Sequence, residues 1–111
     1  MSDSEQLGDC YEASACYLLD RMLARQSCDG WLLCHGVVTP ISGNMAGTSF
    51  GHAWLEIGYE EVLDVSNGRT VNMLLPSYYR LGGIVHADVH RYTFMQAREH
   101  LLTTQVYGPW E

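Results

Sequence analysis

The stretch GHAWLEIGYEEVLDV, residues 51–65, decides the predicted fold. In its first part His52, Trp54 and Glu56 would share one face of a strand and Ala53, Leu55 and Ile57 the other, and a second apolar run follows after a short polar interval. This pattern is typical of two antiparallel strands joined by a tight turn, and we expect the strands at 51–58 and 61–65. His52 and Asp64 then share one face of the sheet, and a turn midway between them places them directly opposite each other.

An amphipathic helix precedes this hairpin. Between residues 10 and 25 apolar side chains recur at helical spacing, and polar residues such as Glu12 occupy the other face. Gly8 permits a tight backbone turn into the helix, so Cys10 is expected in its first turn. Unpaired N–H groups and the helix dipole favour an anion there, which makes Cys10 a candidate thiolate nucleophile.

Turn signals divide the rest of the chain into short elements. We expect a strand at 31–38, a loop at 39–51 typical of a binding loop or lid, a helix from Pro76 to about Gly82, a strand around 84–92 and a helix around 94–103. Thr93 and Gln96 have the spacing of a capping box, and the tail at 107–110 is expected to fold back on the body. The prediction is one α+β domain, residues 1–111, with the helix that carries Cys10 packed on an antiparallel sheet.

Composition narrows the classes of function. The 111 residues include six Lys and Arg against 13 Asp and Glu, a formal charge of −7. This charge disfavours nucleic acid and an anionic membrane surface as partners. The sequence has no apolar run of about 18 residues and no export signal, so we expect a cytoplasmic protein. The four cysteines, Cys10, Cys16, Cys28 and Cys34, are then expected to be reduced thiols.

Cys10, His52 and Asp64 together have the chemistry of a catalytic triad. A thiolate attacks an acyl carbon, an imidazole moves the proton, and a carboxylate holds the imidazole in one tautomer. Backbone N–H groups at the helix start, including that of Cys10, stabilise the oxyanion that forms. If Asp64 is not the group that orients the imidazole, Glu56 and Asn67 are the alternatives.

The helix start at Cys10, the motif His-Ala-Trp-Leu-Glu at 52–56 and the strand that ends at Asp64 resemble the core of the transglutaminase-like and papain-like cysteine enzymes. The resemblance covers residues 8–67. It implies that Cys10 is the nucleophile, that His52 acts as general base and then as acid, and that Asp64 orients His52. A longer set of segments is similar to short proteins encoded by tailed bacteriophages: residues 8–11, 33–36, 51–54, 64–68 and 107–110.

The resemblance implies further site residues. Papain-like enzymes place an oxyanion-stabilising glutamine upstream of the cysteine, and Gln6 is the candidate here, closer to Cys10 than in the family pattern. Tyr11 and Trp54 are candidates for the walls of an acyl pocket, and His35 for a polar wall or a rival base. No cofactor and no metal are implied. The expected partner is a protein or peptide substrate, and the oligomeric state stays open.

Two alternatives stay open. His86 and His90 would bring two imidazoles together on a helix, with Cys34 and His35 as further donors of a zinc site. On a strand, however, residues four apart are separated by about 13 Å. The other alternative is a non-catalytic protein-binding module on the same fold, such as a phage-encoded inhibitor of a host protein. The leading prediction is a cysteine-dependent hydrolase or acyl transferase that acts on an amide, as a peptidase, amidase, deamidase or transglutaminase.

Overall fold

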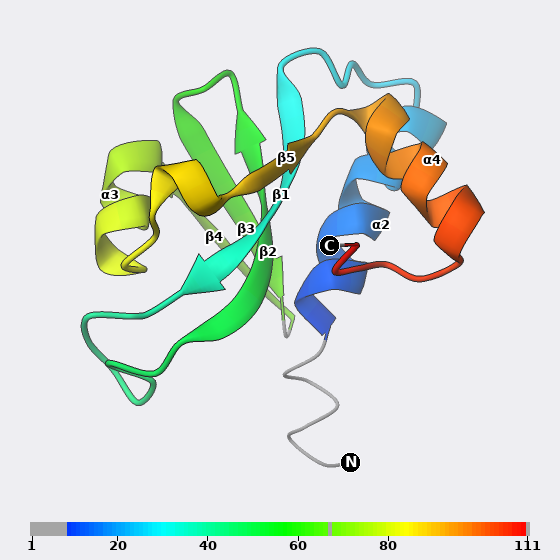
Figure 1. Cartoon of the computed structure of the whole chain (residues 1–111). Helices are drawn as coiled ribbons and strands as arrows, with labels where there is room; N and C mark the ends of the chain where they lie inside the picture. Colours follow the sequence, from blue (N-terminus) through cyan, green and yellow to red (C-terminus); the bar gives the residue numbers. More distant parts are fainter. Residues whose placement is uncertain (1–8, 67, 111) are drawn as a thin grey trace.

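The computed structural model describes residues 9–66 and 68–110, and in it helices cover both faces of a five-stranded antiparallel sheet (Figure 1). The strands are β1 (Trp31–Val38), β2 (Phe50–Ile57), β3 (Glu61–Ser66), β4 (Arg69–Leu74) and β5 (His90–Tyr92), in the sheet order β4-β3-β2-β1-β5. The helices are α2 (Asp9–Leu23), α3 (Leu75–Leu81) and α4 (Phe94–Thr104), with a 3-10 helix at His86–Asp88. The predicted α+β class, with a helix packed on an antiparallel sheet, is confirmed.

Each face of the sheet has its own hydrophobic core. Leu33, Leu55 and Leu63 point toward α2 and α4 and form one core. Trp54 and Val62, which alternate with them, belong to the second core under α3. Figure 1 shows this division, with α3 on one side of the sheet and α2 and α4 on the other. Because side chains alternate along a strand, each strand position is committed to one of the two cores.

The turn between β2 and β3 is centred one residue later than expected. Leu55 is the Cα partner of Leu63, which places the centre at Tyr59, whereas equal spacing of residues 52 and 64 requires Gly58. Both turn residues have a φ of 63°, a left-handed conformation that glycine adopts readily and tyrosine rarely. Since tyrosine is not a turn residue by type, the sequence pattern alone favours the glycine as the centre.

The expected direct pairing of His52 with Asp64 is therefore wrong. When the observed register is continued, Asp64 is opposite Trp54, two residues further along β2. A shift of two residues preserves the alternation of side chains, so His52 and Asp64 still share the face that α3 covers. The Cα pairing covers residues 55–57 and 61–63, and the two side chains meet diagonally beyond its end.

Two other elements differ from the prediction. Residues 69–74 form an unpredicted edge strand, β4, that pairs with β3 along its whole length. Its side chains are mostly exposed, so it lacks the apolar alternation by which a strand is predicted. The strand expected at 84–92 is reduced to the three residues of β5, preceded by the 3-10 helix. Val85 in this segment is exposed and adds nothing to a buried stripe.

Helix α4 begins where the sequence predicts. Thr93 Oγ1 accepts from the Gln96 N–H at 3.2 Å, and Gln96 Oε1 accepts from the Thr93 N–H at 2.9 Å. The tail after α4 folds back as expected, and Trp110 packs against the core that α2 and α4 cover. In the part of the chain that the structure describes, no helix combines the length and the apolar character needed to cross a membrane.

A buried carboxylate connects α3 to the sheet. Glu56 is 2% exposed and accepts hydrogen bonds from Trp54 Nε1 at 3.0 Å, from the Tyr79 hydroxyl and from Arg91 Nε at 3.2 Å. Arg91 Nη2 also donates to the Tyr79 hydroxyl at 2.7 Å. A buried carboxylate is tolerated when its charge is paired and its oxygens accept hydrogen bonds, and both conditions hold here. The network fixes Trp54 and α3 relative to each other.

We expect Glu56→Ala to lower the free energy of unfolding by about 3 kcal/mol, because it removes the charge partner of Arg91 and leaves the buried indole and phenol donors unsatisfied. Urea denaturation followed by tryptophan fluorescence measures the change. Glu60→Ala, at the exposed hairpin turn, is the matched control and should cost less than about 0.5 kcal/mol. Equal losses in the two variants would contradict the role assigned to Glu56.

Candidate active site

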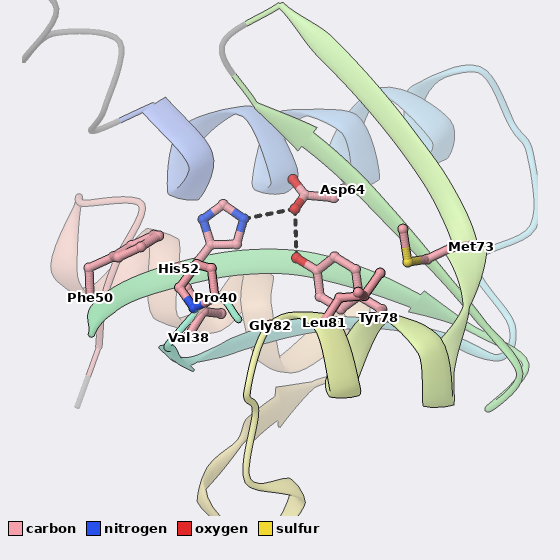
Figure 2. Close-up of a pocket in the computed structure, with 9 residues that line it drawn as sticks. All are labelled: Val38, Pro40, Phe50, His52, Asp64, Met73, Tyr78, Leu81 and Gly82. Atoms are coloured by element: carbon pink, nitrogen blue, oxygen red, sulfur yellow. Dashed lines mark hydrogen bonds and ion pairs between the residues drawn. The ribbon is translucent and has the colours of Figure 1, made fainter. Parts of the chain in front are cut away.

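His52 and Asp64 form a hydrogen-bonded pair on the face of the sheet that α3 covers. His52 Nε2 lies 2.8 Å from Asp64 Oδ2 (Figure 2). The two side chains are 16% and 14% exposed, so the pair is largely shielded from water but still reaches the surface. His52 lies near the start of β2 and Asp64 lies in β3, both beyond the paired part of the hairpin.

Cys10 extends this pair to a chain of three groups. It lies in the first turn of α2, is 3% exposed, and is close enough to His52 to contribute to the raised pKa of the imidazole. Because His52 Nε2 is bonded to Asp64, the other ring nitrogen, Nδ1, is the one left to face Cys10. Figure 2 shows this second nitrogen pointing away from Asp64. The structure thus brings together the three residues that the sequence singles out as a triad.

The neighbours of His52 keep it protonated at neutral pH. Burial alone would lower its pKa, but the hydrogen bonds and negative charges of Asp64 and Cys10 outweigh burial and raise the pKa to about 9. The pKa of Asp64 is lowered. Burial alone would raise it, but the hydrogen bond and charge of His52, together with weaker contributions from other donors, outweigh burial. The raised pKa of His52 stabilises the fold fully below about pH 6.5, and this stabilisation is lost as the pH rises through about 9.

Asp64 is held by two further donors. The Tyr78 hydroxyl donates to Oδ2 at 2.6 Å, the same oxygen that is bonded to His52, and Ser66 Oγ donates to Oδ1 at 3.2 Å. Burial and the charge of Asp64 raise the pKa of Tyr78, so the phenol keeps its proton and remains a donor. Sequence reasoning missed Tyr78, because a tyrosine in a short helix gives no sign of which strand residue it will meet.

Trp54 supports His52 from inside the core. Its indole ring stacks on the imidazole with centroids 6.2 Å apart and planes at 26°, and it contacts the ring of Tyr78 at 5.6 Å. Trp54 is 0% exposed, so it has no surface with which to line a substrate pocket, the role expected for it. Glu56, the alternative to Asp64, uses its hydrogen bonds in the network with Trp54.

His35 lies on the opposite face of the sheet from His52. It pairs with Ala53 across β1 and β2, and alternation turns its side chain toward α2. The ring is 2% exposed, and neither of its nitrogens has a hydrogen-bond partner in the described part of the chain. Burial, with the charges of two nearby histidines, lowers the pKa of His35 to about 4. His35 is therefore a buried, neutral side chain, and it lies on the opposite face of the sheet from the His52–Asp64 pair.

Tyr11 packs beside the backbone that leads into His52. A Cβ atom added at Gly51 would lie 2.7 Å from the Tyr11 hydroxyl oxygen, so only glycine permits this approach. Tyr11 and His35 also border a cavity of about 240 Å³ on this side of the sheet, which extends to His90. Tyr11, predicted as an aromatic wall of an acyl pocket, therefore lines this cavity. It does not line the second cavity, described below, which opens beside Asp64.

Some predicted residues lie outside the described residues, namely Gln6, Gly8 and Asn67. The zinc alternative requires His86 and His90 on one helix, but His86 begins the 3-10 helix and His90 begins β5. Within residues 9–66 and 68–110, no three His, Cys, Asp or Glu side chains come together as a metal ion requires.

A second cavity of about 240 Å³ opens beside the His52–Asp64 pair. Its walls come from the end of β1, from β2, β3, β4 and α3, and from Pro40 in the loop that follows β1, as Figure 2 shows. The lining residues are Val38, Pro40, Phe50, His52, Asp64, Met73, Tyr78, Leu81 and Gly82. The loop that the sequence predicts as a binding loop or lid therefore borders this cavity at both of its ends.

Comparisons with known proteins give no family assignment. No protein-family model and no curated protein matches the sequence, and no solved structure matches the fold.

We expect Tyr78→Phe to lower the free energy of unfolding at pH 7 by about 1.5–3 kcal/mol, the contribution of a hydrogen bond to a charged group. The lost bond also raises the pKa of Asp64. Ionised Asp64 contributes stability above its unfolded pKa, and this is lost as the pH falls through its lowered folded pKa. The loss of stability on acidification should therefore be smaller in the variant and be complete at a higher pH.

Urea denaturation between pH 2 and pH 8 measures both effects. Tyr59→Phe is the control, since Tyr59 is exposed at the hairpin turn. A Tyr78→Phe protein with the stability and acid profile of Tyr59→Phe would show that the Tyr78 hydroxyl does not hold Asp64.

Proposed function

We propose that this protein is a cysteine-dependent hydrolase or acyl transferase that acts on an amide bond, on a papain-like or transglutaminase-like core. The observation that carries the proposal is the hydrogen bond between His52 and Asp64, with Cys10 close enough to the imidazole to raise its pKa. Thiol, imidazole and carboxylate stand in the order of nucleophile, proton carrier and orienting group. The elements that bear them, α2, β2 and β3, follow one another in the order of that core.

In the first half of the proposed reaction, Cys10 is a thiolate beside the protonated His52. The sulfur attacks the carbonyl carbon of the amide, a C–S bond forms, and the carbonyl electron pair moves onto the oxygen. N–H groups at the start of α2 stabilise this oxyanion. When the oxyanion collapses, the C–N bond breaks and His52 gives its proton to the leaving nitrogen. The products are an amine and a thioacyl group on Cys10.

In the second half, the now neutral His52 accepts a proton from water or from an acceptor amine. The oxygen or nitrogen attacks the thioacyl carbon, and the C–S bond breaks with its electron pair returning to sulfur. Water yields a carboxylic acid, and an amine yields a new amide. Asp64 stays ionised throughout, and its bond to Nε2 keeps the proton of neutral His52 on that nitrogen, so that Nδ1 faces the sulfur.

The proposed substrate is a protein or peptide, and the proposed compartment is the cytoplasm, that of a bacterial host if the protein is phage-encoded. The excess of 13 Asp and Glu over six Lys and Arg supports this choice over nucleic acid, because phosphates would be repelled.

Native alkylation tests the nucleophile. Cys10 is 3% exposed, whereas Cys16 and Cys28 are half-buried, so ranking by exposure alone predicts that Cys10 reacts later. Burial raises the pKa of Cys34, which should stay unlabelled. We expect iodoacetamide at pH 7 to label Cys10 first, because the adjacent imidazolium favours its thiolate. Mass mapping after brief treatment measures the order. If the cysteines are labelled in order of their solvent exposure in both the wild type and His52→Gln, the assignment of Cys10 as the nucleophile is wrong.

Acylation tests the triad and separates it from the non-catalytic binding module. We expect p-nitrophenyl acetate to acetylate Cys10, and Asp64→Asn to slow this by up to roughly 10⁴-fold, because Asn can reverse the hydrogen bond and fix the wrong tautomer. Cys10→Ala should abolish acetylation while its melting temperature stays near that of the wild type.

Intact-mass kinetics and a thermal melt on the same samples measure these outcomes. Cys28→Ala is the matched control, because it removes a thiol outside the triad and should leave the rate unchanged. Equal acetylation of the wild type and a folded Cys10→Ala variant would favour the binding module.

A further inference from the structure

The cavity beside Asp64 has an almost entirely apolar lining. Of its nine lining residues, three carry polar side-chain atoms, His52, Asp64 and Tyr78. These atoms are already engaged with one another: Oδ2 of Asp64 lies 2.8 Å from His52 Nε2 and 2.6 Å from the Tyr78 hydroxyl. The remaining walls are aliphatic or aromatic side chains and a glycine.

This lining restricts the chemistry of an occupant. A charged or strongly polar group that enters gives up its hydration and finds no lysine, arginine or further carboxylate to pair with, which costs several kcal/mol. An uncharged apolar group loses nothing by leaving water and gains contacts with Phe50, Met73 and Leu81. The volume of about 240 Å³ is below the roughly 300–1,000 Å³ of sites for drug-sized ligands. It suits one side chain.

The position of the cavity links it to the proposed reaction. His52 forms part of its wall and also lies beside Cys10, so a group placed in the cavity lies one imidazole ring away from the nucleophile. We propose that this cavity binds a single uncharged aliphatic or aromatic group of the substrate, next to the amide bond that Cys10 attacks. The inference rests on the proposed function and adds its substrate class.

Alkylating reagents with different substituents test the cavity without knowledge of the natural substrate. The probes are iodoacetamides whose nitrogen carries butyl, benzyl or 2-hydroxyethyl, together with iodoacetate as the anion. Rates of Cys10 labelling are divided by the rates with free cysteine, which removes intrinsic reactivity. We expect the butyl and benzyl reagents to react at least about tenfold faster than the hydroxyethyl reagent, the low end of what an apolar contact contributes to selectivity.

A filled cavity should lose this preference. Leu81 is 39% exposed at the end of α3, so Leu81→Trp can place its ring in the cavity without disturbing the core. We expect the apolar preference, measured as the ratio of the butyl to the hydroxyethyl rate, to fall to within about twofold. Leu102→Trp, at a 64% exposed position on α4, is the matched control and should keep the full preference.

Methyl NMR locates the bound group directly. In protein labelled at its methionine methyl groups, the butyl adduct on Cys10 should shift the Met73 signal and leave that of Met95, which is exposed on α4, unchanged. Reactive Cys10 with no apolar preference, or with no shift at Met73, overturns the inference and leaves the proposed function standing. Cys10 that resists every reagent overturns the proposed function itself.

Discussion

The site depends on one oxygen atom, Oδ2 of Asp64. It is bonded to Nε2 of His52 from β2 and accepts from the Tyr78 hydroxyl of α3, while Asp64 itself belongs to β3. Three elements therefore meet at a single acceptor. The hairpin ladder has already ended at this point, so these hydrogen bonds, and not strand pairing, hold His52 and Asp64 together.

A second carboxylate on the same face repeats this arrangement. Tyr78 and Tyr79 are consecutive in α3, and each donates to a carboxylate of the sheet, the first to Asp64 and the second to Glu56. Trp54 lies between the two, stacked on His52 and bonded to Glu56. Because Glu56 is fully paired with Arg91, its charge is satisfied inside the core, and Asp64 is left as the carboxylate that serves the imidazole. α3 thus fixes both the orienting group and the support under the imidazole ring.

The sequence predicts the parts of the site that depend on local periodicity. Cys10 in a first helical turn and His52 on the same face as Asp64 follow from periods of 3.6 and two residues, and the face survives even though the turn is centred on Tyr59. The role of Tyr78 depends on how α3 lies across the sheet, which no local pattern contains.

The sequence also misplaces two residues. The position of His35 depends on the register across the long loop between β1 and β2, and that register puts it on the opposite face from His52. Trp54 follows the correct alternation, but its 0% exposure arises from a tertiary contact with α3 that the sequence does not reveal. The edge strand β4 is missing from the prediction because its exposed side chains give no buried stripe.

The raised pKa of His52 suits an amide better than an ester in the proposed mechanism. An amide nitrogen leaves poorly unless it receives a proton, and a group with a pKa of about 9 carries that proton throughout the neutral range. The same property would make His52 a weak base in the second half. However, part of the rise comes from Cys10, and a thioacyl sulfur has neither the charge nor the hydrogen bond. Acylation therefore lowers the pKa of His52 at the stage where the reaction needs a base, so one imidazole serves first as acid and then as base.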